Sequence, residues 1–395
     1  MERIVIIGAG ECGVRAAFAL REQGFAGTIT LLGDDPSLPY ERPPLSKGKD
    51  GALKPIRSEA SYTGAGIELH RGARVAQIDP AEQSVFLQSG ESLSYDALLI
   101  ATGSRARLFP TMDGCLTLRT DADADAIFQS VRRGSTLGII GGGFIGLELA
   151  AVARGIGAKV TVFEAGGRLL ARAVPAEIAG MVAARHQAEG VTIRMGVNVA
   201  AATGTAVSLF DGETLTFDQV VAGVGSVPNT ELAEAAGLEF ENGIRVDDNF
   251  RTSDPQIFAA GDCCSFVWRG ARVRLESWKA AQDQGAFAAS AMLGNTGSYT
   301  NVPWFWSDQY DLTMQVAGLF DSALAVTGRP TGEGQRIFFQ CNAEGQLLAA
   351  AGIGPGNSIV KDIRIFEKLI ERGAPLDPGL LADPSQNIKR LLRAA

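Results

Sequence analysis

Residues 4–22 read IVIIGAGECGVRAAFALRE, in which a short apolar run is followed at once by a glycine turn and an alanine-rich segment. The run 4–7 predicts a buried strand, and residues 14–21 have the composition of a helix. Glycines in this spacing permit a tight turn, let the backbone approach a phosphate and allow the helix to pack on the strand. Those glycines are Gly8, Gly10 and Gly13. The stretch predicts a dinucleotide site at a helix N-terminus, and the alternative is an ordinary glycine turn.

The same pattern occurs again in residues 137–149, which read LGIIGGGFIGLEL and hold Gly141, Gly143 and Gly146 in the same frame. The strand expected over 159–163 ends at Glu164. A carboxylate there accepts from a ribose 2′-hydroxyl and repels a 2′-phosphate, so we expect NADH rather than NADPH. Arg168 and Arg172 weaken that preference, because they can equally contact the pyrophosphate. Two such motifs in one chain predict two dinucleotides.

Length and composition narrow the class of protein. The 395 residues suffice for two or three domains, and 46% hydrophobic content supports a large core. A net charge of −8 argues against a nucleic-acid partner. The five cysteines form neither a disulfide framework nor a metal or CxxC pattern, which is typical of the reducing cytoplasm. We expect no signal peptide, because the first strand begins at residue 4, and no membrane span, because the most apolar stretch, 139–153, contains Glu148.

Several polar residues follow expected strands or a rigid loop in the first part of the chain. Asp34 ends the strand expected over 28–32, where an acidic residue binds a ribose hydroxyl; the alternative is a turn aspartate. The segment 39–47, PYERPPLSK, predicts a stiff loop that presents Arg42 and Lys47, unless both charges simply face solvent. In residues 72–100 we expect antiparallel strands, the last of which ends at Thr102, where small residues let the backbone approach a ligand.

The later part of the chain contains further candidates. The strand in RTSDPQIFAAGD, residues 251–262, ends at Asp262, which suits a polyol hydroxyl. Ser277 is a plausible N-cap for a helix over 278–292. Trp278 and Trp306 are by default core or rim aromatics. From about residue 307 short alternating segments predict a small antiparallel sheet, followed by helices over 359–372 and 387–394. His70 and His186 lie in no motif, and we expect both to be ordinary surface or loop residues.

The chain resembles the FAD-dependent NADH:ferredoxin reductases of bacterial oxygenase systems, essentially from end to end. The resemblance rests on the order of PYERPPLSK, the two glycine motifs, FAAGD and PWFWSDQ. The expected fold class is α/β, with two Rossmann-like nucleotide-binding domains of the glutathione-reductase kind and a C-terminal α+β domain. We expect an FAD-binding domain over 1–107 and 240–306, an NAD-binding domain over 108–239 and the C-terminal domain over 307–395.

The resemblance implies a set of cofactor contacts. Lys47 would lie beside the reactive edge of the flavin and pair with Glu148 near the nicotinamide. Val75 would touch the adenine through its backbone. The other FAD residues would be Gly8, Gly10, Cys12, Gly13, Asp34, Arg42, Thr102, Arg119, Asp262, Trp278 and Trp306, of which position 278 varies among relatives. NADH would be held by Gly141, Gly143, Gly146, Glu164 and Arg172. No metal site is expected.

The family transfers a hydride from NADH to FAD and passes single electrons to an acidic [2Fe–2S] ferredoxin that feeds a P450 or a Rieske dioxygenase. Such transfer needs orientation and exclusion of water rather than a nucleophilic side chain. We expect a transient ferredoxin partner, no nucleic acid and no membrane. A basic patch is formed by Arg269, Arg272, Arg274 and Lys279. We expect it to steer the ferredoxin by charge, and the alternative is that these residues only form a solvated loop.

Four other classes share parts of this pattern. A flavin disulfide reductase needs a redox cysteine pair and a C-terminal histidine, but Cys12 has no partner on its helix, and Cys263 and Cys264 are expected in the core. An NADH oxidase or peroxidase would need an active-site cysteine. A rubredoxin reductase and a non-catalytic FAD/NAD-binding signalling flavoprotein are the remaining alternatives.

Overall fold

The structure is a computed structural model that describes residues 1–48 and 53–394. The chain divides into two compact units, which are considered separately. The first unit combines Met1–Arg42, Gly51–Arg105 and Ser226–Asn301. The second combines Pro43–Asp50, Ala106–Gly225 and Val302–Ala395.

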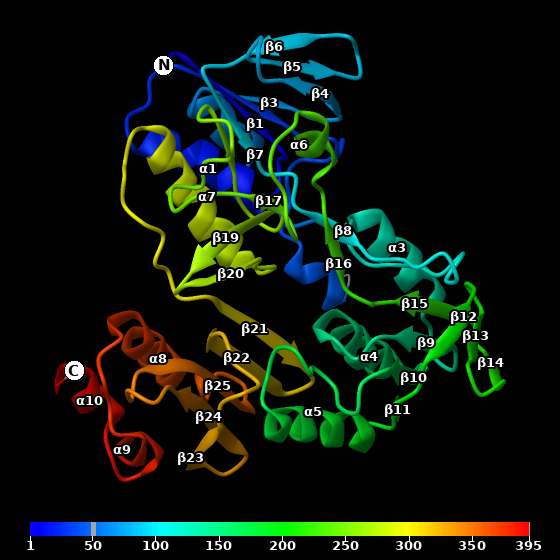
Figure 1. Cartoon of the computed structure of the whole chain (residues 1–395). Helices are drawn as coiled ribbons and strands as arrows, with labels where there is room; N and C mark the ends of the chain where they lie inside the picture. Colours follow the sequence, from blue (N-terminus) through cyan, green and yellow to red (C-terminus); the bar gives the residue numbers. More distant parts are fainter. Residues whose placement is uncertain (49–52, 395) are drawn as a thin grey trace. The chain divides into compact units, whose positions relative to one another are not determined.

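A parallel five-stranded sheet forms the centre of the first unit (Figure 1). Its strands, in spatial order, are β18 (Ile257–Ala259), β7 (Ala97–Ile100), β1 (Arg3–Ile7), β2 (Thr28–Leu32) and β3 (Ile67–His70). The run that we expected to be antiparallel, β7, instead pairs parallel to β1 and β18. All four of its residues are buried, which is typical of a central parallel strand.

Two helices of this unit, α1 (Glu11–Glu22) and α7 (Trp278–Met292), pack closely against each other. A Cβ on Gly285 would lie 2.3 Å from the carbonyl oxygen of Cys12, so only glycine permits this approach. As expected, Ser277 caps α7: its hydroxyl accepts from the backbone N–H of Ala280 at 3.2 Å. The first unit also contains shorter elements: α2 (Glu59–Gly64), β4 (Val75–Asp79), β5 (Ser84–Leu87), β6 (Ser92–Ser94), α6 (Glu231–Ala235), β17 (Ile244–Arg245), β19 (Cys264–Trp268) and β20 (Ala271–Val273).

The second unit contains a parallel four-stranded sheet, in the order β11 (Thr192–Met195), β10 (Lys159–Glu164), β9 (Thr136–Ile140) and β15 (Gln219–Ala222). The glycine motif joins β9 to α4 (Phe144–Ile156). Thr120 caps the start of α3 (Asp121–Ser130) with a capping box, because its hydroxyl and the Asp123 carboxylate each accept from the other's backbone N–H. Other elements of this unit are η1 (Pro43–Ser46), α5 (Ala176–Ala188), β12 (Val199–Ala202), β13 (Ala206–Leu209) and β14 (Thr214–Thr216). The short strands β8 (Ser104–Ala106) and β16 (Ser226–Pro228) pair with each other.

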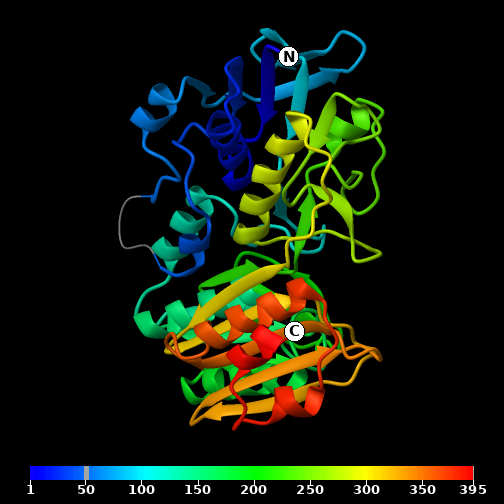
Figure 2. The same ribbon diagram turned by 90° about the vertical axis from the view of Figure 1, so that its left-hand side faces the viewer.

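The C-terminal part of the second unit is an antiparallel five-stranded sheet covered by α8 (Val360–Arg372), drawn in orange and red in Figure 2. The strands run in the order β21 (Trp304–Gln309), β22 (Leu312–Gly318), β25 (Leu347–Pro355), β24 (Gln335–Cys341) and β23 (Thr327–Gly332). Phe339, Phe366 and Leu369 form the centre of its core. Two short helices follow, α9 (Pro378–Ala382), which we did not expect, and α10 (Ile388–Ala394).

The expected fold class is confirmed, since two parallel nucleotide-binding sheets are joined to an antiparallel α+β part. The domain limits remain predictions, and the limit placed between residues 306 and 307 falls inside β21. No helix in the described ranges 1–48 and 53–394 is long and apolar enough to cross a membrane.

Candidate functional site

The first glycine motif forms a tight cradle between β1 and α1. Gly8 has a φ of +109°, and a Cβ there would lie 2.2 Å from the carbonyl oxygen of Ala101. A Cβ on Gly13 would lie 2.0 Å from the carbonyl oxygen of Gly8. The N-cap of α1 is Gly10, which provides no side-chain hydrogen bond to the first turn. The helix therefore offers its N–H groups and its dipole to an anion, as a dinucleotide pyrophosphate requires. Cys12 lies in the first turn of that helix and is buried.

The carboxyl ends of the strands in the first unit bring several predicted residues to one edge of the sheet. Gly8 follows β1, Asp34 follows β2, Thr102 follows β7 and Asp262 follows β18. This edge is where α/β sheets bind nucleotides. Asp34 is 70% exposed and lies 3.9 Å from a guanidinium nitrogen of Arg74. Its neighbour Asp35 makes the turn that we weighed for Asp34: Asp35 Oδ1 accepts from the N–H of Ser37 at 2.8 Å.

The remaining residues of this edge are held by hydrogen bonds to residues far away in the sequence. The Thr102 hydroxyl donates to the carbonyl oxygen of Asn229 at 2.7 Å, and the Asn229 amide donates back to the carbonyl of Thr102 at 2.9 Å. Ser104 donates its hydroxyl proton to Asp262 at 3.0 Å. Three more predicted residues lie in the first unit: Arg42, beside the position a Gly10 Cβ would take, Val75 at the start of β4, and Trp278 at the start of α7.

The second glycine motif repeats the cradle between β9 and α4. Gly141 has a φ of +107°, and its Cβ would lie 2.3 Å from the carbonyl oxygen of Gly223. A Cβ on Gly146 would lie 2.5 Å from the carbonyl oxygen of Gly141. In contrast, a Cβ on Gly143 would meet none of the described atoms within 4 Å. Gly143 therefore leaves open space at the start of α4, where a pyrophosphate can approach the backbone.

Glu164 ends β10 and is anchored to the cradle by two backbone groups. Its Oε2 accepts from the N–H of Gly142 at 2.7 Å, and its Oε1 accepts from that of Gly166 at 2.6 Å. Both oxygens keep further acceptor capacity for ribose hydroxyls. Of the two nearby arginines, Arg168 donates to carbonyls of its own loop, whereas Arg172 is exposed.

Lys47 lies just after η1 and forms an ion pair that the sequence did not predict. Its Nζ lies 2.7 Å from Oδ2 of Asp308 and 5.1 Å from the ring centroid of Trp306. The indole of Trp306 also donates to Asp308 at 3.1 Å, and Thr313 donates to the other carboxylate oxygen at 2.8 Å. The expected direct pair between Lys47 and Glu148 is therefore replaced by one with Asp308.

Glu148 points from α4 into the protein and is only 7% exposed. One carboxylate oxygen accepts from the hydroxyl of Ser307 at 2.6 Å and the other from the hydroxyl of Ser46. Burial raises the pKa of Glu148, although these two hydrogen bonds and the nearby Lys47 partly oppose the shift. Both oxygens of this buried carboxyl thus have a hydrogen-bond donor.

Ser46, Ser307 and Asp308 were missed as candidates, although each lies inside a motif that we quoted. Ser46 belongs to the proline loop, and the other two belong to PWFWSDQ. The remaining predicted FAD residue of the second unit is Arg119, which precedes α3 and whose N–H donates to Asp123 at 2.9 Å.

The prediction for His186 was wrong. It lies in α5, is fully buried, and contacts Gln309 through Nε2 at 2.8 Å and Tyr310 through Nδ1 at 3.1 Å. Its partners lie more than a hundred residues away in the sequence, so no local pattern marks it. His70 ends β3 and is half-buried.

Two of the four side chains in the expected basic patch form ion pairs with neighbouring carboxylates. Arg274 pairs with Glu276, and Lys279 pairs with Asp283. Arg272 donates to the carbonyl oxygen of Ser265 at 2.8 Å. Paired surface charges attract a partner weakly, so a steering role for this patch stays a prediction without new support.

The buried cysteines are poorly suited to thiol chemistry. All five cysteines are free. Burial raises the pKa of the Cys12, Cys263 and Cys264 thiols, which disfavours the reactive thiolate. Among the described residues, no cluster of three or more His, Cys, Asp or Glu side chains could hold a metal ion.

Comparison with known proteins decides the family. A family model for pyridine nucleotide-disulphide oxidoreductases matches residues 2–285, and a reductase C-terminal model matches residues 304–392. This chain belongs to the pyridine nucleotide-disulphide oxidoreductases. It is therefore an oxidoreductase, and membership implies binding of FAD and NAD(H).

Within that family the chain belongs with the ferredoxin–NAD(+) reductases of oxygenase systems. It is 42% identical to the ferredoxin–NAD(+) reductase component of the anthranilate 1,2-dioxygenase system of Burkholderia cepacia, over 98% of each chain. The ferredoxin reductase for the CYP199A2 system of Rhodopseudomonas palustris is 35% identical, with a TM-score of 0.93 over 99% of this chain and 100% of that one. The covalent putidaredoxin reductase–putidaredoxin complex is 33% identical, with a TM-score of 0.91 over 100% and 99%.

The residues of this pyridine nucleotide-disulphide oxidoreductase fit both cofactors. Each glycine cradle leaves no room for a Cβ at two of its glycine positions. The helices that follow, α1 and α4, begin without a side-chain cap. The two cradles thus provide the backbone N–H groups that two pyrophosphates need.

Proposed function

We propose that this chain takes a hydride from NADH onto FAD and passes single electrons to a [2Fe–2S] ferredoxin that feeds an oxygenase. The observation that carries the proposal is the presence of two dinucleotide cradles in one chain whose full-length relatives are ferredoxin reductases. The named systems of those relatives include a dioxygenase and a P450. The putidaredoxin complex supports an iron–sulfur protein as the partner.

When bound, FAD supplies the chemistry that converts a two-electron donor into single electrons. The protein's own residues bind, orient and exclude water. Lys47 contributes a fixed positive charge, because Asp308 and the face of Trp306 restrict its ammonium group. Glu148 contributes a buried carboxyl held by two serine hydroxyls. We propose these two residues as the catalytic pair, each acting through its charge rather than as a nucleophile.

We assign the FAD pyrophosphate to the β1–α1 cradle and the NAD pyrophosphate to the β9–α4 cradle. Glu164 supports NADH as the donor, because its anchored carboxylate would repel the 2′-phosphate of NADPH. The individual FAD contacts proposed from the resemblance keep their assignment, with Asp34 and Val75 toward the adenosine and Asp262 toward the flavin.

We also propose that the protein works in the cytoplasm. The support for this location is the set of five free cysteines, three of them buried in the first unit, which is typical of a reducing compartment.

The test is a steady-state assay of the purified yellow protein with NADH or NADPH and a panel of acceptors. The panel holds [2Fe–2S] ferredoxins of dioxygenase and P450 systems, a rubredoxin and oxygen alone. We expect many turnovers per second with NADH and at least one of the ferredoxins. Rapid NADH consumption with oxygen alone, and none coupled to any ferredoxin, would instead identify an NADH oxidase.

A further inference from the structure

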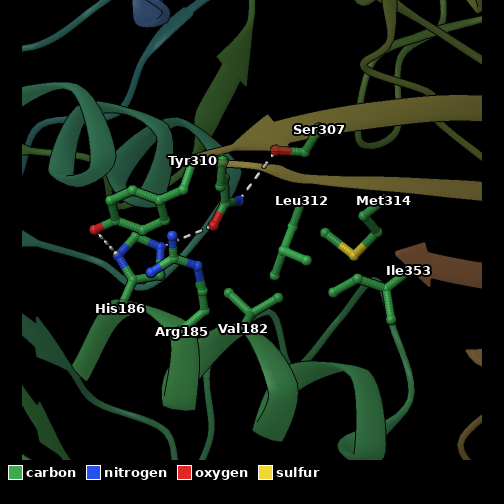
Figure 3. Close-up of a pocket in the computed structure, with 9 residues that line it drawn as sticks. Val182, Arg185, His186, Ser307, Tyr310, Leu312, Met314 and Ile353 are labelled. Carbon is green, nitrogen blue, oxygen red and sulfur yellow. Dashed lines mark hydrogen bonds between the residues drawn. The ribbon is translucent and has the colours of Figure 1, made fainter. Parts of the chain in front are cut away.

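A small pocket lies in the second unit between α5 and the β21–β22 hairpin (Figure 3). Its volume of about 10 Å³ accommodates roughly one water molecule, so it is not a substrate site. One half is apolar and includes Val182, Leu312, Met314 and Ile353. The other half is polar, and four of its side chains form a continuous series of hydrogen bonds.

That series runs from Tyr310, in the turn after β21, through His186 on α5 to the buried carboxyl of Glu148. The Tyr310 hydroxyl lies 3.1 Å from Nδ1 of His186, and His186 Nε2 lies 2.8 Å from Oε1 of Gln309. Gln309 donates its amide N–H to the Ser307 hydroxyl oxygen at 3.0 Å. Ser307 in turn donates to Glu148 at 2.6 Å. We name these four residues, Tyr310, His186, Gln309 and Ser307, the relay.

The inventory of donors and acceptors gives the relay a single direction. Ser307 accepts from Gln309, so its one proton is free to go to Glu148. The Gln309 carbonyl oxygen can only accept, so His186 must carry its proton on Nε2. His186 Nδ1 then accepts from the Tyr310 hydroxyl. Every donor in the relay therefore points toward the Glu148 carboxylate, whose second oxygen accepts from Ser46.

We propose that the relay keeps Glu148 ionised and fixed in orientation, which makes His186 and Gln309 positioning residues for the NADH half-reaction. The part of this inference that concerns NADH rests on the proposed function. The relay does not conduct protons, because the amide of Gln309 has no proton to pass on at neutral pH. Its effect is on the charge and the position of one carboxyl.

Most of the relay is buried, which makes each of its bonds consequential. His186 is fully buried, and Ser307 and Gln309 are buried beside it. A buried polar network stabilises only when every member is satisfied, and one missing donor leaves the next group unpaired. Burial raises the pKa of Glu148, so the hydrogen bonds from the two serines are needed to hold its ionised form.

The charged groups near Glu148 and near His186 are compatible with an ionised Glu148 and a neutral His186. Lys47 and Asp308 are the charged groups near Glu148, and they are already paired with each other. Burial lowers the pKa of the His186 imidazole, the hydrogen bond to Gln309 opposes that shift, and the positive charge of nearby Arg185 adds to it. Arg185 itself pairs with Asp311 at 2.9 Å and with Glu189. The net lowering of the pKa favours the neutral form of His186 that the direction of the relay requires.

The backbone at Tyr310 supports a dedicated role. Tyr310 has a φ of +56° in the turn between Gln309 and Leu312, a conformation that is unfavourable for a bulky side chain. Its ring lies 4.7 Å from the Arg185 guanidinium and 5.0 Å from the His186 ring centroid. A glycine would suit this turn better, and would leave His186 without its donor.

The experiment follows the charge of Glu148 in the FAD-loaded full chain by infrared spectroscopy across a pH series. The carbonyl stretch of its protonated carboxyl is identified by its loss in Glu148→Gln. In Gln309→Leu we expect the pH midpoint of this band to rise by about one unit, the size expected for weakening a hydrogen bond to a charged group. Met314→Leu changes the apolar half of the same pocket and should leave the midpoint unchanged.

Ser307→Ala removes the last donor alone and should raise the midpoint at least as much, so it decides the question if Gln309→Leu does not fold. A wild-type Glu148 already protonated at neutral pH would overturn the proposal, as would an unshifted midpoint in the folded variant. The acid limb of the rate of NADH-driven flavin reduction should shift with the band. A shifted band in a protein that reduces no ferredoxin would contradict the proposed function and leave the relay intact.

Discussion

Lys47 shows how one charge is fixed by residues far away in the sequence. Its ammonium group is held by Asp308 and by the face of Trp306, both on β21. In Lys47→Met we expect bound FAD to remain and its reduction by NADH to slow by roughly ten- to a hundredfold, because a preorganised charge is lost. Stopped-flow absorbance of the flavin at saturating NADH measures the rate.

The matched control for that substitution is Lys54→Met. Lys54 also forms a carboxylate pair, with Glu41 at 2.9 Å, but its side chain is 67% exposed. Exposed pairs contribute little, so this variant should reduce its flavin at the wild-type rate. An equal rate in all three proteins would remove Lys47 from the catalytic pair.

Glu164 is expected to determine the choice of nicotinamide cofactor. In Glu164→Gln the side chain keeps its size but loses the charge that opposes a 2′-phosphate. The ratio of kcat/KM for NADH to that for NADPH should fall by about tenfold, and steady-state kinetics with both donors measures it. Glu177→Gln, on an exposed position in the first turn of α5, should leave the ratio unchanged. An unchanged ratio in Glu164→Gln would mean that the two backbone bonds, rather than the charge, are its function.

His186 should make stability depend on pH. Burial lowers its pKa in the folded state, whereas the unfolded chain takes up the proton near the ordinary value of about 6.5. The unfolded state then binds more protons, so the contribution of His186 to the free energy of unfolding is present above about pH 6.5 and is lost as the pH falls. His186→Gln should flatten the fall in denaturant-measured stability between about pH 7 and pH 5. Parallel pH curves for the two proteins would contradict a neutral buried imidazole.

At the scale of elements, two glycines of the β9–α4 cradle have different roles: Gly146 allows close packing, and Gly143 leaves space for a ligand. Gly146→Ala should lower both the melting temperature and NADH affinity, because its Cβ would lie 2.5 Å from the Gly141 carbonyl oxygen. Gly143→Ala meets none of the described atoms within 4 Å and should fold with little change in melting temperature. Its KM for NADH should nevertheless rise by about tenfold, because the added methyl group obstructs the pyrophosphate. Thermal melts and steady-state kinetics of the two variants provide the test. An unaltered KM for NADH in folded Gly143→Ala would show that the pyrophosphate does not bind at this cradle.

The elements that the sequence predicted well are those with local signals. The strand–turn–helix of residues 4–22 and the cap at Ser277 each depend on neighbouring residues, and both are confirmed. Short elements such as α9 contain too few residues for a periodic pattern. The pairing of β7 was wrong, because four buried apolar residues fit a parallel strand as well as an antiparallel one. The contacts of Glu148 and His186 join β21 to helices more than a hundred residues earlier, a relation that no local spacing encodes.

At the scale of the whole molecule, FAD should act as a structural component. A ligand that binds only the folded chain stabilises it by mass action, by about 2.7 kcal/mol at a hundredfold excess over Kd. Apoprotein should therefore melt several degrees lower than the FAD-loaded protein, and added FAD should restore the higher melting temperature.

Gly10→Ala is the informative variant, because its Cβ faces only the end of the Arg42 side chain at 3.3 Å. It should leave the apoprotein melting temperature unchanged but shrink the increment due to FAD. Gly64→Ala, in open space at the end of α2, should keep the full increment. A wild-type increment in Gly10→Ala would place the FAD pyrophosphate away from the first cradle.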